Sequence, residues 1–230
     1  MGFGPPSMFK ASAFPKSKCI IRCQAAALSD DYDPKEVVER RIQAQRPAES
    51  PLFLYVGRLS AEKGIETLLA AFTAVLRKLP SSRLKLVGDG PSKAALQFLA
   101  ADLGITGSVD FTGGVQPEAI ASSYLESTCL VLPSFSEPWG LVVNEALAYG
   151  CPVLVSNRCG CVPEMASNPL TGMVFEAGDS AQLAERLLAA PGQFKDWGAT
   201  ANRCLHEIST YTPRNAAQAI LEGVTRNRKR

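Results

Sequence analysis

From Pro51 onward, short apolar runs alternate with segments of helical periodicity, and this alternation limits the folds that the chain can adopt. Six runs bounded by glycine or proline are expected to be strands: LFLYVG, RLKLVGDGP, SVDFTG, CLVLPS, PVLVS and GMVFEA. Between them, segments such as residues 64–80 place apolar side chains on one stripe and end at proline or glycine, as amphipathic helices do. Strands that alternate with helices form βαβ units. We therefore predict an α/β fold with a single Rossmann-like, doubly wound parallel sheet.

The length of 230 residues fits one large domain with additional segments at its ends. We expect residues 1–50 to form an amino-terminal arm and linker, partly disordered, with a short exposed helix within residues 30–50. Residues 51–190 are expected to form the Rossmann-like domain, and residues 191–230 a carboxyl-terminal helical tail.

Charge and hydropathy argue against two kinds of partner. The net charge of +2 argues against nucleic acid, and no apolar run approaches the roughly 18 residues that span a bilayer.

Residues 1–29 carry four basic and no acidic side chains, which suits an organelle transit peptide. A poorly ordered leader or the remnant of a preceding domain is the alternative. We expect a cytoplasmic protein, or one in a plastid or other organelle if this segment is a transit peptide.

Seven cysteines and one histidine give little basis for a metal site. Cys129 and Cys151 lie in or beside apolar runs and are expected to be small buried residues. The C-x-C at 159–161 and the C-x-x-x-C at 19–23 lack the second half of a tetrahedral zinc site. An odd cysteine count without a secretory signal favours reduced thiols inside the cell. His206, the only histidine, is expected on the polar face of a late helix.

The first strand exit, GRLSAEKG, carries two cations. In doubly wound sheets, ligands bind where the carboxyl ends of strands meet the amino ends of helices. Gly57 allows a tight turn, and Arg58 and Lys63 follow before a helix begins. The arginine fork, the lysine charge and the helix N–H groups could together hold a diphosphate. Ordinary solvated loop charges are the alternative, and neither the P-loop nor the dinucleotide glycine fingerprint is present.

Glycines follow the second and third strands. Gly88 and Gly90 stand at one exit, and Gly113 and Gly114 at the next. They bring flexible backbone to the same edge of the sheet, although tight turns explain them without a ligand.

The fourth exit, SEPWGLVVNEALAYG, combines two acids with a helix start. Glu137 is expected in the loop, because the proline after it disfavours helix at this position. Gly140, Leu141 and Val142 are expected to present free N–H groups at the amino end of the helix. Glu145 lies eight residues after Glu137, roughly 12 Å along a helical path, which is about the length of a nucleotide sugar.

Glu145 stands on an otherwise apolar helix and needs a partner. An unpaired carboxylate in such surroundings would cost several kcal/mol or shift its pKa. A polar ligand and a salt bridge are the two candidates.

Four segments, GRLSAEKG, LVGDGP, FTGGV and SEPWGLVVNEALAYGCPVLVS, resemble the carboxyl-terminal, donor-binding domain of retaining GT-B glycosyltransferases of the family 4 type. The E-x7-E spacing of that family is met by Glu137 and Glu145. The resemblance covers roughly residues 51–190, so the predicted sheet would be one half of a GT-B fold.

The resemblance implies roles for the residues at the strand exits. Arg58 and Lys63 would contact the donor diphosphate and stabilise the departing charge, and Glu137 would hold the transferred sugar. Glu145 would hold the ribose, with backbone contributions from the glycine exits and the helix start. The backbone positions are Gly57, Gly88, Gly114, Gly140, Leu141 and Val142. Such enzymes use UDP-, GDP- or ADP-sugars, generally need no metal or other cofactor, and retain the anomeric configuration.

The activity implied is transfer of a sugar from a nucleotide-diphosphate sugar, with this chain supplying the donor-binding half. Family members have a second Rossmann-like half that holds the acceptor, whereas only about fifty residues precede the donor domain here. A protein partner is therefore expected to supply the acceptor half. The alternative is a non-catalytic module that binds a nucleotide sugar, or a split-enzyme subunit.

Overall fold

The computed structural model describes residues 24–26, 28 and 32–228, apart from the side chains of 117–118 and 223–228. The expected leader within residues 1–29 and the disorder of the arm fall largely outside the described residues, as do both cysteines of the 19–23 pair.

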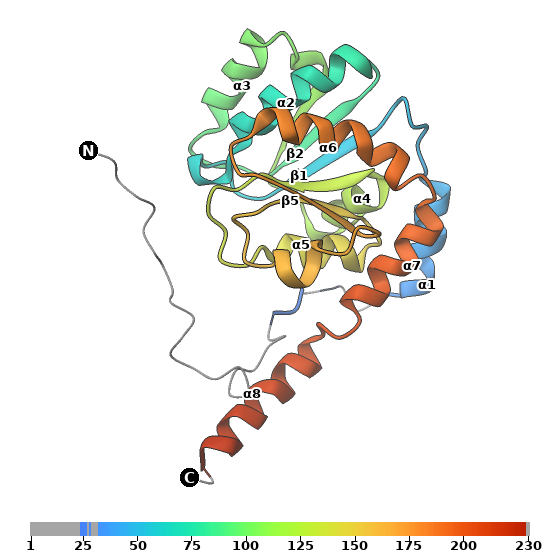
Figure 1. Cartoon of the computed structure of the whole chain (residues 1–230), viewed down its shortest axis with the longest axis vertical. Coiled ribbons are helices and arrows are strands. Elements are labelled where there is room, and N and C mark those ends of the chain that lie inside the picture. Colours follow the sequence, from blue (N-terminus) through green and yellow to red (C-terminus); the bar gives the residue numbers. More distant parts are fainter. Residues whose placement is uncertain (1–23, 27, 29–31, 229–230) are drawn as a thin grey trace, which may run out of the picture. The chain divides into compact units, whose positions relative to one another are not determined.

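Six parallel strands form one sheet in the order β3-β2-β1-β4-β5-β6 (Figure 1). The strands are β1 (Leu52–Val56), β2 (Arg83–Val87), β3 (Val109–Gly113), β4 (Cys129–Leu132), β5 (Val153–Ser156) and β6 (Gly172–Phe175). All six predicted strands and the predicted Rossmann-like parallel sheet are confirmed. The central strands β4 and β5 are buried throughout, as expected for parallel strands covered on both faces.

Helices cover both faces of the sheet. Those in the same compact unit as the sheet are α1 (Pro34–Gln43), α2 (Ile65–Lys78), α3 (Lys93–Asp102), α4 (Pro117–Glu126), α5 (Leu141–Ala148), α6 (Ser180–Gln193) and α7 (Trp197–Ile208). A further helix, α8 (Pro213–Arg228), belongs to a separate unit. Short helical turns are η2 (Ala61–Lys63), η3 (Thr106–Ser108) and η4 (Val162–Ala166). Helices α2 and α6 pack together on one face, while α5 covers the opposite face and contacts α7 (Figure 1).

Local sequence signals explain where these elements begin and end. The apolar stripe of α2 is buried at Leu68, Leu69 and Phe72. The carboxylate of Asp179 accepts a hydrogen bond from the N–H of Gln182 at 2.9 Å and so caps α6.

The sequence predicts an exposed helix here, and this prediction is wrong for one face of α1, which is buried. Val37 is 5% exposed and Arg41 is fully buried. Nη1 of Arg41 donates to three carbonyl oxygens at the end of α4, and its guanidinium lies 3.9 Å from the centre of the Trp197 ring. The last carbonyls of a helix lack partners within the helix, and Arg41 supplies a donor for them. Burial of the guanidinium lowers the pKa of Arg41.

Two compact units can be described, each by itself. The larger spans Ala26–Ser209 and contains the sheet together with α1 and α7. The other includes Thr210–Arg230, whose described part is mainly helix α8.

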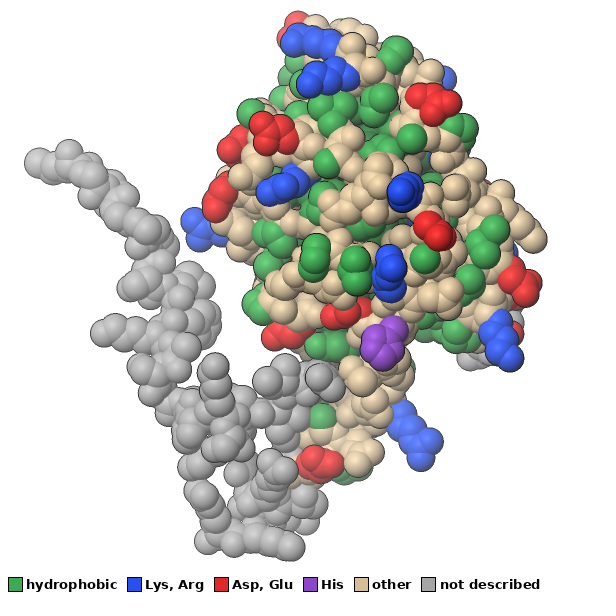
Figure 2. Space-filling view, turned by 45° about the vertical axis from the view of Figure 1, so that its right-hand side comes forward, with side chains coloured by type: hydrophobic (Ala, Val, Ile, Leu, Met, Phe, Trp, Pro, Cys, Tyr) green, Lys and Arg blue, Asp and Glu red, His purple; other side chains and the backbone are tan. Residues whose placement is uncertain are grey.

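Individual side chains agree with several expectations. Cys129 and Cys151 are fully buried free thiols. His206 lies exposed on α7, and Figure 2 shows acidic and basic side chains mixed over the face that it presents. Within the described part of the chain, no helix is both long and apolar enough to cross a membrane.

Candidate functional site

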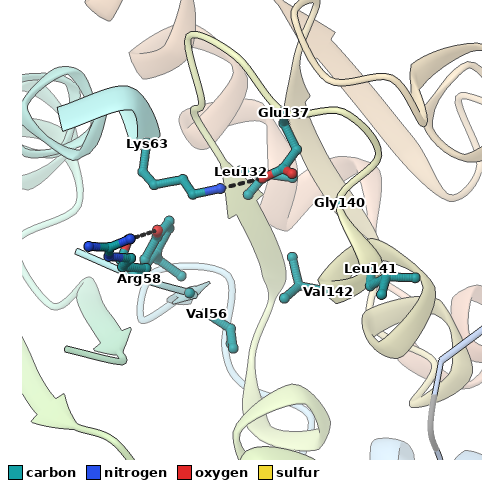
Figure 3. Close-up of a pocket in the computed structure, with 10 residues that line it drawn as sticks. Val56, Arg58, Lys63, Leu132, Glu137, Gly140, Leu141 and Val142 are labelled. Atoms are coloured by element: carbon teal, nitrogen blue, oxygen red, sulfur yellow. Dashed lines mark hydrogen bonds and ion pairs between the residues drawn. The ribbon is translucent and has the colours of Figure 1, made fainter. Parts of the chain in front are cut away.

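A pocket of about 220 Å³ opens at the carboxyl ends of β1 and β4, where the strand order changes direction. Figure 3 shows the residues that line it. They are Tyr55, Val56, Gly57, Arg58, Lys63, Leu132, Glu137, Gly140, Leu141 and Val142. Seven of the ten predicted site residues are among them. The change of direction in a doubly wound sheet is where a ligand crevice is expected.

Lys63 and Glu137 reach toward each other from two walls of the pocket (Figure 3). Nζ of Lys63 donates to Oε2 of Glu137 at 2.6 Å. The lysine comes from the turn η2 after β1, and the glutamate from the loop after β4. The two side chains keep 20% and 15% of their surface exposed, so the pair can be reached by a ligand.

Arg58 is exposed at the mouth of the pocket, and its backbone is held by a residue that the sequence analysis missed. The hydroxyl of Tyr55, fully buried in β1, donates to the carbonyl oxygen of Arg58 at 2.8 Å. Burial, and then the charges of Glu137 and Glu62, raise the pKa of Tyr55, so the hydroxyl keeps its proton. The sequence feature that could have identified Tyr55 is its hydroxyl-bearing side chain in an otherwise apolar strand.

The loop that carries Glu137 is fixed by its neighbours. The N–H of Gly160 donates to the carbonyl of Glu137 at 2.9 Å, and the N–H of Phe135 donates to the carbonyl of Glu62 at 2.9 Å. The second bond joins the loop after β4 to the turn after β1. The carboxylate and the lysine are therefore carried by segments that are directly hydrogen-bonded.

The amino end of α5 borders the same pocket. Gly140 has φ +98°, a conformation that favours glycine, and the helix begins at the next residue. The first N–H groups of a helix have no partner within it, and they carry partial positive charge. Leu141 and Val142 place these groups beside the carboxylate and the cations, as predicted.

Gly88 and Gly114 do not line the pocket. Gly88 supports its wall, because a Cβ atom there would lie 2.0 Å from the carbonyl oxygen of Gly57, and its φ is +138°. Around Gly114, no described atom lies within 4 Å of such a Cβ position. Gly88 therefore serves the packing of two strand exits, while the backbone at Gly114 faces open space.

Glu145 does not line the pocket either, and lies one helical turn beyond Val142 on α5. The expected partner was a ligand or a salt bridge, but the structure shows a phenol instead. The hydroxyl of Tyr124, on α4, donates to Oε2 of Glu145 at 2.9 Å. Burial raises the pKa of Glu145, and the bond from Tyr124 acts in the opposite direction.

No cluster of three or more metal-ligating side chains is found in the described part of the chain. Two cations, one carboxylate and a helix amino end make this pocket suited to an anionic, hydroxyl-bearing ligand.

A parallel doubly wound sheet with this pocket at its switch point defines a Rossmann-like ligand-binding domain. Residues 38–190 match the family described as "Glycosyl transferases group 1", and the chain belongs to that family. The chain is 35% identical over 156 residues to the sulfoquinovosyl transferase SQD2 of Arabidopsis thaliana, covering 66% of this chain and 29% of that protein.

Solved structures give the same picture. Sucrose-phosphate synthase from Thermosynechococcus elongatus superposes with a TM-score of 0.65 at 30% identity, covering 83% of this chain and 48% of that one. The carboxyl-terminal domain of a group 1 glycosyl transferase from Francisella tularensis superposes with a TM-score of 0.64 at 24% identity. It covers 75% of this chain and 93% of that domain. The chain spans 29% to 47% of the length of eight curated relatives.

Proposed function

We propose that this chain is the donor-binding half of a retaining GT-B glycosyltransferase of the family 4 type. Its donor is a UDP-, GDP- or ADP-sugar. The observation that carries the proposal is the convergence of Arg58, Lys63, Glu137 and the amino end of α5 on one pocket. Family membership supports the reaction class.

In the transfer step, an acceptor hydroxyl forms a bond to the anomeric carbon of the sugar, and its proton passes to the departing diphosphate oxygen. The bond from that carbon to the diphosphate oxygen breaks, and the nucleoside diphosphate leaves with the electron pair. Arg58 and Lys63 stabilise the negative charge that develops on the leaving group, together with the first N–H groups of α5. This chemistry is supplied by fixed cations and dipoles, and we propose that it needs no metal.

Glu137 accepts hydrogen bonds from hydroxyls of the transferred sugar and holds its anomeric carbon near the diphosphate-binding groups. Glu145 accepts from the ribose hydroxyls at the other end of the donor. Its place on α5, one turn beyond the residues that line the pocket, supports this role. The exits at Gly88 and Gly114 let the backbone approach the nucleotide.

The acceptor site lies outside the described pocket in this proposal, and a protein partner supplies it. The second candidate is a module that binds a nucleotide sugar without transferring the sugar. The two are separated by assaying sugar transfer with the partner present.

The test is a thermal-shift panel of UDP, GDP, ADP and their glucose conjugates. A ligand that binds only the native state stabilises it by about 2.7 kcal/mol at 100 times its Kd, so one nucleotide family should raise the melting temperature. Lys63→Ala should abolish the shift, whereas Lys78→Ala, at the exposed end of α2, should not. If none of the nucleotides stabilises the protein, the proposal fails.

A further inference from the structure

We propose that Tyr124 is a positioning residue for nucleotide binding: its hydroxyl holds one oxygen of Glu145, so that the other oxygen is presented to the ribose hydroxyls. The inference rests on the proposed function, which places the donor ribose at Glu145. It adds a residue from α4, an element that contributes nothing to the lining of the pocket.

The contact is well defined. Tyr124 is fully buried, and its hydroxyl lies 2.9 Å from Oε2 of Glu145. A carboxylate has acceptor sites on both oxygens, whereas a phenol has one proton to donate. Among the described residues, Tyr124 is the only side chain that donates to this carboxylate. The bond at Oε2 therefore orients the group and leaves Oε1 to accept from a ligand.

The ring of Tyr124 cannot easily turn away from Glu145. It stacks on Tyr149, with ring centres 5.8 Å apart and planes 8° apart. Tyr149 meets Tyr32 edge to face at 5.8 Å, and the Tyr32 hydroxyl donates to the carbonyl of Ala148 at 2.6 Å. Offset and edge-on aromatic pairs of this spacing are attractive. Three rings thus brace the phenol against α5, the helix that carries the carboxylate.

The backbone of Tyr124 is held as well. Nη1 of Arg41 donates to the carbonyl oxygen of Tyr124 at 3.2 Å and to that of Leu125 at 2.8 Å. The ring and the backbone are fixed from opposite sides, by α5 and by α1. Groups that orient a ligand-binding side chain in this way tune its affinity without touching the ligand.

The same bond controls the charge of Glu145. Burial raises the pKa of this carboxyl, and donation from Tyr124 favours the ionised form. Burial and then Glu145 raise the pKa of Tyr124, and Cys151 and Tyr149 raise it further. The phenol therefore stays protonated and keeps donating. Without it, the carboxyl would hold its proton to a higher pH and accept ribose hydroxyls less well.

The experiment measures binding of UDP and 2′-deoxy-UDP by calorimetry, with the GDP and ADP pairs run in parallel. The wild-type protein should bind the ribonucleotide about 10-fold more tightly than the 2′-deoxyribonucleotide, which is the difference expected for one hydrogen bond to a charged group. Tyr124→Phe should remove most of this preference by weakening the ribonucleotide alone. The pH below which binding weakens should also move upward in the variant. Ser123→Ala removes a neighbouring hydroxyl from α4, one that donates to the carbonyl of Ala119, and should keep the preference.

The outcomes separate this inference from the proposed function. If no ribonucleotide binds the wild-type protein, the proposed function itself fails. If the wild type prefers ribose and Tyr124→Phe prefers it equally, with an unchanged pH profile, the positioning role is overturned while the function stands. A wild type that binds both sugars equally overturns the role of Glu145 and with it that of Tyr124.

A second variant covers the case in which Tyr124→Phe does not fold, which circular dichroism would show. Replacement of Tyr124 by 3,5-difluorotyrosine keeps the ring and makes the hydroxyl a stronger donor. The pH below which UDP binding weakens should then move downward. No movement of this midpoint would overturn the inference.

Discussion

Lys63 and Glu137 are separated by 74 residues in the sequence and meet at 2.6 Å in the structure. In the proposed function these two side chains hold different parts of the donor. In the proposed function, the diphosphate therefore takes the place of the carboxylate as the partner of the lysine. The carboxylate is then released to accept from the sugar hydroxyls.

Glu137→Gln tests this exchange. The rate of sugar transfer should fall by about 100-fold, which is typical of removing one group that stabilises the transition state. Affinity for the nucleoside diphosphate should be unchanged or higher, because the diphosphate no longer competes with a carboxylate for Lys63. Nucleotide release and calorimetry measure the two quantities.

The matched control is Glu66→Gln, an exposed acid in the first turn of α2. It should alter neither quantity. A parallel loss of nucleotide affinity and transfer in Glu137→Gln would contradict the exchange.

Substitutions at Gly88 and Gly114 give a second test at the level of single residues. Gly88→Ala forces a Cβ to within 2.0 Å of the Gly57 carbonyl oxygen at a φ that favours glycine, and should destabilise the protein by about 1–3 kcal/mol or more. Gly114→Ala meets no described atom within 4 Å and should leave stability unchanged. Urea denaturation measures both. If Gly114→Ala weakens nucleotide binding at unchanged stability, the nucleotide passes close to this backbone.

At the scale of elements, one arginine joins α1 to two neighbouring helices. Arg41 donates to the carbonyls of Tyr124, Leu125 and Ser127, and stacks on Trp197. It joins α1, the end of α4 and the start of α7. The helix therefore stabilises the domain rather than only leading into it.

Arg41→Ala should lower the free energy of unfolding by about 3 kcal/mol or more. Three buried carbonyls lose their donor, and the side chain leaves a cavity. The adjacent Arg40 is the control, because its only described ion pair, with Glu36, is exposed at 3.6 Å. Arg40→Ala should change stability by less than about 0.5 kcal/mol. Equal effects of the two substitutions in urea denaturation would disprove this role for Arg41.

The elements that sequence patterns predict best are those whose own residues make the signal. CLVL and PVLV predict β4 and β5 because strands buried on both faces must be apolar throughout. Helix α1 reads PKEVVERRIQ, and nothing in that pattern distinguishes Arg41 from Arg40. Its burial depends on carbonyls at the end of α4, 83 or more residues away. Such a contact has no local sequence signal.

The candidate site likewise contains residues whose positions the sequence predicts and residues whose contacts it does not predict. Arg58, Lys63 and Glu137 could be predicted to converge because the carboxyl ends of parallel strands share one edge of the sheet. The partner of Glu145 could not be predicted, because Tyr124 belongs to a different helix and its sequence context is that of an ordinary core aromatic. The hydroxyl of Tyr55 bonds to a carbonyl only three residues away, and it was missed because a tyrosine in a buried strand has the sequence context of an ordinary core aromatic.

At the scale of the whole molecule, the larger compact unit begins at Ala26, well before the first strand. A chain beginning at residue 26 should therefore melt cooperatively and bind nucleotide. A chain beginning at residue 51, which lacks α1, should lose more stability than Arg41→Ala, because the buried face of Val37 and Arg41 is removed entirely. Thermal denaturation of the two shortened chains measures this. Equal melting temperatures would show that α1 is dispensable.

The strand order β3-β2-β1-β4-β5-β6 also has a consequence for synthesis on the ribosome. One edge of β1 stays open until β4 emerges and pairs Phe53 with Cys129. At about 5–20 residues per second, this interval lasts several seconds, during which the bare edge is a place for misassembly. In the proposed function, the donor site is complete only when Glu137 has followed β4 out of the ribosome, so the donor cannot help the nascent amino-terminal strands to fold. Chaperones, rather than substrate, would have to protect them.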